Sequence, residues 1–175
     1  MPKLIPELEE KFLEAARKRI FDGEAGKLTI RQIAQDCGTA AGTVYNYFPS
    51  KQVLIAAVIQ EDWEKCVQQM DVHTDSAPTA MEGLESICAA LRVFTIRHSL
   101  FWDHYGGVGI TRGKLFNYHH QVITQIELPV RALLERFDKL SDPYLSMIIA
   151  EILLHAARNE NGFSLVEPTL KKLLL

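Results

Sequence analysis

Apolar residues recur at steps of three and four positions along nearly the whole chain, as they do on one face of an amphipathic α-helix. The first such stripe consists of Leu8, Phe12, Leu13, Ala15, Ala16 and Ile20. No stretch shows the strict alternation of polar and apolar residues that marks a half-buried strand. The pattern therefore predicts an all-α fold with roughly eight or nine helices.

Capping residues divide this pattern into separate helices. Ser, Thr, Asp and Asn side chains cap helix N-termini, whereas glycine and proline commonly end helices. The expected caps are Thr29, Thr39, Ser50, Thr79 and Asp142, with Gln32 and Glu82 completing capping boxes at Thr29 and Thr79. The expected stops are Gly23, Gly38, Pro49, the turn-rich segment 71–78, and Asn161-Gly162. These signals predict two short helices before Pro49 and a long one from Lys51 to about Met70.

The second half of the chain predicts further helices. One apolar stripe extends from Leu84 to His98, and another from Leu115 to Phe137 contains Pro129, which should kink or interrupt the helix. Asp142-Pro143 is a strong start signal for a helix that extends to Asn159. A last short helix is expected over 167–175.

Residues 29–51 have the proportions of a helix-turn-helix, in which a turn of three or four residues joins two short helices. Gly38 suits such a turn because glycine reaches positive φ without strain. The residues expected to face inward are Ile30, Ile33, Ala34, Val44 and Phe48. The other residues of the second helix are uncharged and several are small: Ala40, Ala41, Gly42, Thr43, Tyr45, Asn46 and Tyr47. Such a face can enter a DNA groove, where small apolar groups meet thymine methyls and hydroxyls reach phosphates or base edges.

This window resembles the DNA-binding signature of the TetR family of transcriptional regulators. The matching residues are Leu28-Thr-Ile-Arg-Gln-Ile-Ala, Cys37-Gly, Gly42-Thr-Val-Tyr-Asn-Tyr-Phe and Lys51. The resemblance implies a three-helix DNA-binding domain over 1–50, followed by a helical ligand-binding and dimerisation domain over 51–175. The segment Lys51–Met70 would be the helix that connects the two.

The resemblance also implies a role for each position. Thr43, Tyr47 and Lys51 would hold phosphates, and Arg31 would reach a base edge or a phosphate. The complete expected DNA-contacting set is Thr29, Arg31, Thr39, Ala40, Ala41, Gly42, Thr43, Tyr45, Asn46, Tyr47 and Lys51. The alternative for the aromatic residues of this set is an ordinary place in the hydrophobic core.

The helix expected over 143–159 is apolar on more than one face, which indicates burial on most sides. TetR-like regulators dimerise through their last long helices, and a helix-turn-helix reads a near-palindrome as a dimer. The expected interface residues are Leu145, Ile148, Ile149, Ile152, Leu153 and Ala156. The alternative is a helix that packs only within its own chain.

Polar groups lie on otherwise apolar stripes of the middle helices, close in sequence to several aromatic residues. A cavity lined by aromatic side chains and a few polar groups is typical of a small-molecule site. In the TetR family such a pocket binds an inducer. The candidate pocket residues are Cys66, Met70, Cys88, Leu91, Phe94, His98, Trp102, Tyr105, Phe116 and His119. Each could equally be a satisfied core residue.

Composition, cysteine count and the length of the apolar runs exclude transmembrane, disulfide-scaffold and disordered proteins. The chain has 175 residues, of which 47% are hydrophobic and 23% charged, and its net charge is −3. Residues 1–51 contain eight basic and seven acidic residues, whereas 52–175 contain eleven and fifteen. Because salt screens charges over about 8–10 Å, a small basic patch can bind DNA on a mildly acidic protein. The longest apolar run, Val53–Ile59, is far shorter than the ~18–20 residues of a membrane span.

The sequence favours no catalytic, metal or cofactor site. Three cysteines, Cys37, Cys66 and Cys88, lie at no metal-like spacing and are expected to be reduced in a cytoplasmic protein. The histidines His104, His119 and His120 have no cysteine or carboxylate at ligand spacing. The segment 109–114 fails as a phosphate loop because Val108 and Leu115 replace the residues that the motif requires.

These observations predict a ligand-responsive, homodimeric regulator that binds double-stranded DNA, a repressor released from a near-palindromic operator by a small-molecule inducer. The alternative is a helical module that binds small molecules or proteins and has lost specific DNA recognition. The salt dependence of duplex binding separates the two hypotheses.

Overall fold

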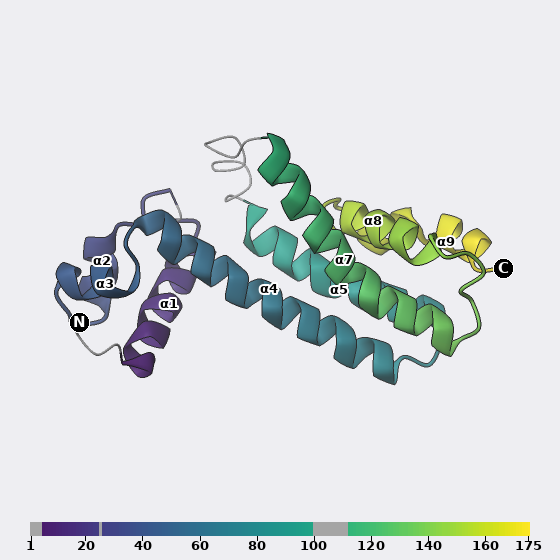
Figure 1. Cartoon of the computed structure of the whole chain (residues 1–175), viewed down its shortest axis with the longest axis horizontal. Coiled ribbons are helices and arrows are strands. Elements are labelled where there is room, and N and C mark those ends of the chain that lie inside the picture. Colours follow the sequence, from purple (N-terminus) through teal and green to yellow (C-terminus); the bar gives the residue numbers. More distant parts are fainter. Residues whose placement is uncertain (1–4, 25, 100–111) are drawn as a thin grey trace. The chain divides into compact units, whose positions relative to one another are not determined.

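The computed structural model describes residues 5–24, 26–99 and 112–175, with side chains from 119 onward in the last range. These residues form helices and contain no strand, which confirms the all-α prediction. Figure 1 shows the elements in order: α1 (Pro6–Phe21), α2 (Ile30–Asp36), α3 (Ala41–Tyr47), α4 (Lys51–Ser76), α5 (Ala80–Arg97), α7 (Arg112–Arg136), α8 (Leu145–Ala157), the 3-10 helix η1 (Gly162–Leu165) and α9 (Glu167–Leu173).

The chain packs as two compact units. Of the described residues, the first unit contains those up to Trp63 together with 97–99, and the second contains 64–96 and those from 112 onward. The helix α4 therefore contributes its first half to one unit and its second half to the other. The functional boundary expected between 50 and 51 remains a prediction.

In the first unit, α1 has the charge distribution that a helix dipole favours. Its first turn is acidic and its last turn is basic. The helix ends where Gly23 takes a φ of +78°, as the expected glycine stop predicts. The buried stripe of α1 consists of Phe12, Leu13, Ala16 and Ile20.

The helix α4 begins as the sequence predicts but extends further. Ser50 accepts a hydrogen bond from the amide of Val53 at 3.2 Å, which confirms its role as the cap. The expected turn-rich break after Met70 is wrong, because the helix continues to Ser76. Thr74 is buried, and Arg136 of α7 donates to the carbonyl oxygens of Thr74 and Asp75 at 2.7 and 2.8 Å. Packing and this external capping of the last turn override the local turn signals.

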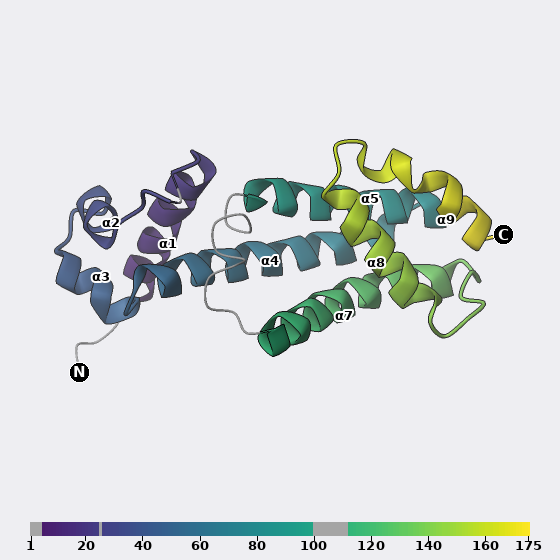
Figure 2. The same ribbon diagram turned by 90° about the horizontal axis from the view of Figure 1, so that it is seen from above.

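In the second unit, α5 and α7 approach closely at a glycine. A Cβ added to Gly83 would lie 2.6 Å from both terminal methyl carbons of Leu133, and both residues are buried. Gly83 therefore allows the two helices to pack at a distance that a larger side chain would prevent. Figures 1 and 2 show α8 crossing beside α7 and α5, and the thiol of Cys88 on α5 donates to the carbonyl of Leu153 on α8 at 3.9 Å.

The later helices differ from expectation at their ends and at the internal proline. The helix α7 runs through Pro129 without interruption. The helix α8 begins at Leu145, because Asp142 accepts a hydrogen bond from the amide of Tyr144 in a turn that precedes the helix. The last helix, α9, ends at Leu173. Among the described residues, no helix combines the length and apolar character needed to cross a membrane.

Candidate nucleic-acid interface

The helices α2 and α3 form the expected helix-turn-helix within the first unit. Thr29 accepts a hydrogen bond from the amide of Gln32 at 3.3 Å, and the Gln32 side chain accepts one from the Thr29 amide at 2.9 Å. These two bonds confirm the capping box. Gly38 in the turn has a φ of +64°, the left-handed conformation that favours glycine. Ile30, Ile33, Ala34, Val44 and Phe48 are buried, as expected.

The second helix has no side-chain cap. Its N-cap is Ala40, and the hydroxyl of Thr39 turns back to donate to the carbonyl of Ala34 at 3.5 Å. The expectation that Thr39 caps α3 is therefore wrong, because the α2 carbonyl is the better placed partner. Thr39 joins the end of α2 to the turn.

The outward side of α3 is uncovered and uncharged. Six of the expected DNA-contacting residues are exposed: Thr29, Arg31, Ala40, Gly42, Tyr45 and Asn46. The other five are partly buried: Thr39, Ala41, Thr43, Tyr47 and Lys51. None of the eleven lies in the core, so the surface that would approach DNA is open in this unit.

Tyr47 lies at the boundary between the core and this surface. Its ring packs edge-on against Phe12, with the ring centroids 5.4 Å apart. Its hydroxyl accepts a hydrogen bond from the amide of Ile5 at 2.8 Å and donates one to the Ile5 carbonyl at 3.4 Å. The bond from the amide holds the oxygen in place, and the donated bond is long, so a phosphate can replace the carbonyl as its acceptor.

Lys51 occupies the first turn of α4, and its ammonium group donates to the carbonyl of Gly26 at 3.0 Å. This contact holds the side chain over the segment that precedes α2. An ammonium group has three donors, so a phosphate can bind the others without breaking this bond. Lys51 and Tyr47 thus combine a structural contact with a donor that a phosphate can use.

Ion pairs attach α1 to α2. The guanidinium of Arg19 donates to both carboxylate oxygens of Asp36, at 2.6 and 2.9 Å. This hydrogen bonding lowers the pKa of Asp36 and offsets the single negative charge of α2. The thiol of Cys37 also donates to the carbonyl of Lys11 at 3.5 Å. Arg31, the basic residue of α2, remains exposed.

The expected pocket residues separate into different environments. Cys66, Met70, Cys88, Leu91 and Phe94 are buried in the second unit. Burial raises the pKa of Cys66 to about 12 and that of Cys88 to about 11, so both thiols stay protonated at neutral pH. Trp102, Tyr105 and the Phe116 side chain fall outside the described residues.

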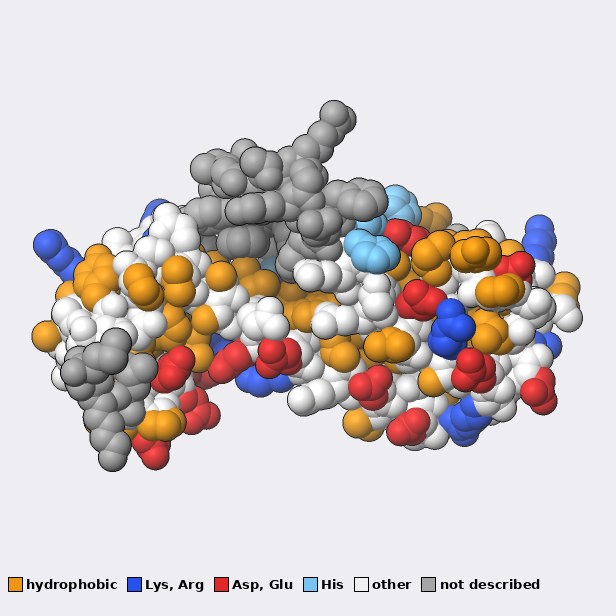
Figure 3. All heavy atoms as spheres, viewed as in Figure 1, with side chains coloured by type: hydrophobic (Ala, Val, Ile, Leu, Met, Phe, Trp, Pro, Cys, Tyr) orange, Lys and Arg blue, Asp and Glu red, His pale blue; other side chains and the backbone are white. Residues whose placement is uncertain are grey.

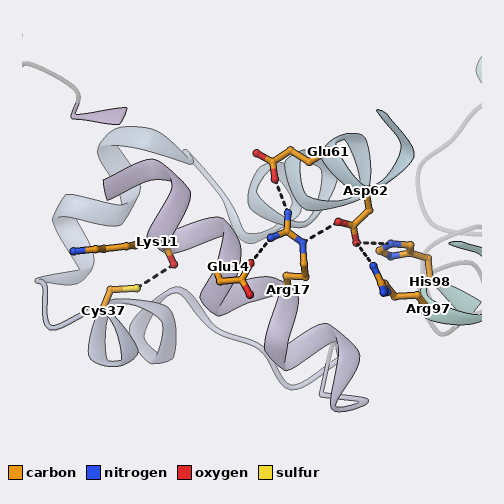
Figure 4. A network of polar contacts seen from close by, with 8 residues as sticks. All are labelled: Lys11, Glu14, Arg17, Cys37, Glu61, Asp62, Arg97 and His98. Atoms are coloured by element: carbon orange, nitrogen blue, oxygen red, sulfur yellow. Dashed lines mark hydrogen bonds and ion pairs between the residues drawn. The ribbon is translucent and has the colours of Figure 1, made fainter. Parts of the chain in front are cut away.

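Two histidines expected in the pocket have other partners. His98 belongs to the first unit, where its Nε2 donates to Asp62 at 3.0 Å (Figure 4). His119 is half exposed, and its Nε2 lies 3.0 Å from a carboxylate oxygen of Glu151 on α8. Each of these histidines therefore bonds a carboxylate within its own unit, and their place in a ligand pocket remains a prediction.

Asp62 and Arg17 are the polar residues that the sequence reasoning missed. Asp62 has only 2% of its side chain exposed, and Arg17 of α1 donates to it at 2.8 Å. The sequence does indicate the buried position of Asp62, because this residue follows Val58 and Ile59 and precedes Cys66 at helical spacing on an apolar stripe. A carboxylate at such a position requires a buried partner.

The expected dimer residues fall on two sides of α8. Leu145, Ile149, Leu153 and Ala156 face the core of their own chain, with 0–5% exposure, which accounts for their apolar character. Ile148 is 46% exposed and Ile152 is partly exposed, so only these two of the six remain accessible. Figure 3 shows exposed hydrophobic and acidic side chains side by side over this part of the chain.

Within the described residues, no group of three or more His, Cys, Asp or Glu side chains is arranged to hold a metal ion. A shallow hollow lies beside α1 and is lined mainly by charged residues: Glu14, Ala15, Lys18, Arg19, Asp22, Glu24 and Asp36. Its arginine is already paired with Glu24 and Asp36, so the hollow resembles an ordinary solvated ion-pair surface.

Two solved structures resemble the whole chain. A TetR-family transcriptional regulator from Pectobacterium atrosepticum aligns over 98% of this chain and 96% of its own, with a TM-score of 0.69 and 18% identity. The regulator FadR from Bacillus subtilis, solved with stearoyl-CoA, aligns over 94% and 97%, with a TM-score of 0.63 and 14% identity. At these identities the likeness establishes the fold.

Sequence comparison places the similarity on the helix-turn-helix. The HTH-type transcriptional regulator YvdT of Bacillus subtilis, described as uncharacterized, is 42% identical over 60 residues, which span 34% of this chain and 31% of YvdT. The chain thus matches about a third of that relative's length. Residues 12–58, which contain α2, α3 and most of α1, match the family described as bacterial regulatory proteins, tetR family. The helix-turn-helix region of this chain is thus similar to that of the tetR family of bacterial regulatory proteins.

Proposed function

We propose that the protein is a homodimeric transcriptional regulator that binds double-stranded DNA in the cytoplasm and responds to a small molecule. The observation that carries the proposal is the exposed, uncharged outer side of α3 inside the region that matches the tetR family. Arg31 and Lys51 flank this surface with positive charge. A helix of this kind can lie close to base edges while the flanking cations hold the phosphates.

The individual contacts follow from side-chain chemistry. Arg31 is exposed on α2 and can donate two hydrogen bonds to a guanine. Ala40 and Gly42 leave room for the groove floor, and Tyr45 and Asn46 supply uncharged polar groups. Lys51 and Tyr47 would hold phosphates. The operator of a dimer that uses two such surfaces would be near-palindromic.

The response to a small molecule is the second part of the proposal. FadR of Bacillus subtilis, whose fold resembles that of this chain, was solved in complex with stearoyl-CoA, and the second unit of this chain has a buried core of helices. We infer a small-molecule inducer that releases the protein from its operator, which would make it a repressor. The competing function is a helical binding module without specific DNA recognition.

The DNA-binding proposal is tested by selecting genomic fragments with the purified protein and measuring their affinity at several salt concentrations. Replacing Arg31 with alanine is expected to weaken binding to the selected duplex by about 5- to 150-fold, because a bidentate base contact contributes ~1–3 kcal/mol. Replacing Lys51 with alanine should reduce the slope of log affinity against log salt by about one.

A matched control removes the same charge far from the proposed surface. Lys172 is exposed on α9, so Lys172→Ala should leave both the affinity for DNA and its salt slope unchanged. Equal affinity of the wild-type protein for selected and scrambled duplexes would contradict the proposal and favour the competing module. If Arg31→Ala and Lys172→Ala lost DNA affinity equally, α2 would not be part of the DNA interface.

The homodimer is tested at the exposed side of α8. Replacing Ile148 with glutamate is expected to convert the dimer to monomers, because a charge buried at an interface without a partner is strongly unfavourable. The position is 46% exposed in the single chain, so the monomer fold should tolerate the change. Sedimentation velocity measures the outcome, with Val93→Glu on the exposed side of α5 as the control. A folded Ile148→Glu dimer would exclude this side of α8 from the interface.

A further inference from the structure

Three segments of the first unit meet at the buried carboxylate of Asp62 on α4 (Figure 4). Arg17 of α1 donates from Nε to one oxygen at 2.8 Å, and Nε2 of His98 donates to the other at 3.0 Å. Asp62 and His98 have 2% and 0% of their side chains exposed. Burial by itself would raise the pKa of Asp62, but these hydrogen bonds outweigh it and hold the pKa below its ordinary value. The carboxylate is therefore charged and held from two sides.

The residue before His98 makes a second contact with α1. The guanidinium of Arg97, the last residue of α5, lies 3.8 Å from the same oxygen of Asp62 that His98 binds. It also lies 5.9 Å from the centre of the Phe21 ring, at the end of α1. The pair 97–98 thus contacts α4 directly and reaches α1 both through Asp62 and through Phe21.

The opposite side of α1 is attached to the helix-turn-helix. Arg19 binds Asp36 of α2 with two hydrogen bonds, and Phe12 packs against Tyr47 of α3. The helix α1 therefore lies between the Asp62 cluster and both helices of the proposed DNA-binding surface. A displacement of α1 would move the contacts that position α2 and α3.

A buried ionic cluster can transmit such a displacement. A buried charge that loses its partner is left uncompensated, so the members of the cluster resist separation. The cluster therefore either moves as a body or breaks, and these are two discrete states. Because α5 continues directly into His98, a shift of the end of α5 acts on this cluster first.

We propose that Asp62, Arg97 and His98 form a latch through which the end of α5 sets the position of α1 and, through α1, of the helix-turn-helix. His98 is a positioning residue in this arrangement, because it acts on Arg17 through Asp62. The effect on DNA rests on the proposed function, whereas the effect on α1 does not depend on it. The two parts are therefore measured separately.

The first measurement is amide hydrogen exchange of α1 by mass spectrometry in the full-length protein. His98→Leu removes the donor to Asp62, and His98→Gln keeps a nitrogen donor at a similar reach. We expect α1 amides to exchange about tenfold faster in His98→Leu, within the ~5- to 150-fold range of typical coupling energies, and near the wild-type rate in His98→Gln. The control Val93→Ala, on the exposed side of α5, should leave α1 unchanged.

Two outcomes would overturn the latch. Unchanged exchange in α1 of a folded His98→Leu protein would show that His98 does not act on that helix. Equal acceleration in α1 and in α8 would show a merely structural role, since α8 belongs to the other unit. If His98→Leu does not fold, Arg97→Gln is the second variant, because Arg97 has 37% of its side chain exposed, and the same comparison of α1 with α8 decides.

The second measurement is affinity for the DNA selected by the wild-type protein. We expect His98→Leu to weaken binding about fivefold or more, with His98→Gln close to wild type. Unchanged affinity alongside faster α1 exchange would overturn the step from α1 to the helix-turn-helix. Failure of the wild-type protein to select any duplex would contradict the proposed function, while the exchange measurement would still decide whether the latch exists.

Discussion

Replacing Asp62 with alanine is expected to lower the free energy of unfolding by about 3–5 kcal/mol, because it removes the buried charged partner that Arg17 and His98 share. Arg17 has 17% of its side chain exposed and would retain only its contacts with Glu14 and Glu61. The buried imidazole of His98 would lose its acceptor as well. Urea unfolding followed by circular dichroism measures the difference at pH 7.

The matched control for this variant is Glu61→Ala. Glu61 pairs with the same guanidinium, but its side chain is 38% exposed, so its removal should cost less than about 1 kcal/mol. A loss of under about 1 kcal/mol in Asp62→Ala would contradict the importance of the buried pair.

The pH dependence of the free energy of unfolding provides a second test of the Asp62→Ala variant. The pKa of Asp62 is lower in the folded protein than its ordinary value near 3.9. Its ionised form therefore stabilises the fold fully above about pH 4, and this contribution disappears as the pH falls through the folded-state pKa. The difference in stability between wild type and Asp62→Ala should accordingly narrow in strong acid, when both proteins are followed by urea unfolding.

Phe12→Ala is expected to lower the free energy of unfolding by about 3–5 kcal/mol, the usual cost of truncating a fully buried phenylalanine. Phe12 is 0% exposed and its ring supports Tyr47, so the cavity would lie between α1 and α3. The surrounding helices are joined by ion pairs, which limits how far they can collapse into the cavity. Thermal or urea unfolding measures the loss.

Phe21→Ala is the matched control, because it makes the same substitution at the other end of α1. Phe21 is 68% exposed and contacts the guanidinium of Arg97, a contact that contributes about 0.5–1 kcal/mol at exposed sites. Similar losses for Phe12→Ala and Phe21→Ala would mean that the contact with Tyr47 does not anchor α3.

Local chemistry was sufficient to predict the helix-turn-helix. The capping box at Thr29 involves Gln32, three positions further on, and the positive φ at Gly38 is a property of that one residue. Both features depend on local sequence alone, and both are confirmed. The five inward-facing residues follow from helical periodicity, which repeats over a single turn. The same reasoning predicted Ser50 as the cap of α4.

Local chemistry failed where a distant partner competes with it. The helix α4 continues through the turn-rich segment because Arg136, which lies about 60 residues further along the chain, donates to the carbonyl oxygens of Thr74 and Asp75. Thr39 leaves the N-terminus of α3 uncapped because the carbonyl of Ala34 is within reach. The apolar residues of α8 indicated burial correctly, but periodicity does not distinguish the chain's own core from a partner.

The order of residues along the chain was enough to establish the all-helical fold, the short paired helices and the side of them that faces outward. These features depend on hydrogen bonds and side-chain spacings within one or two helical turns. Folding alone brought Asp62 between Arg17 and His98, and Tyr47 to the backbone of Ile5, across sequence separations of 36 to 45 residues. Contacts over such separations depend on how helices pack in space, and the local pattern of polar and apolar residues carries no record of that packing.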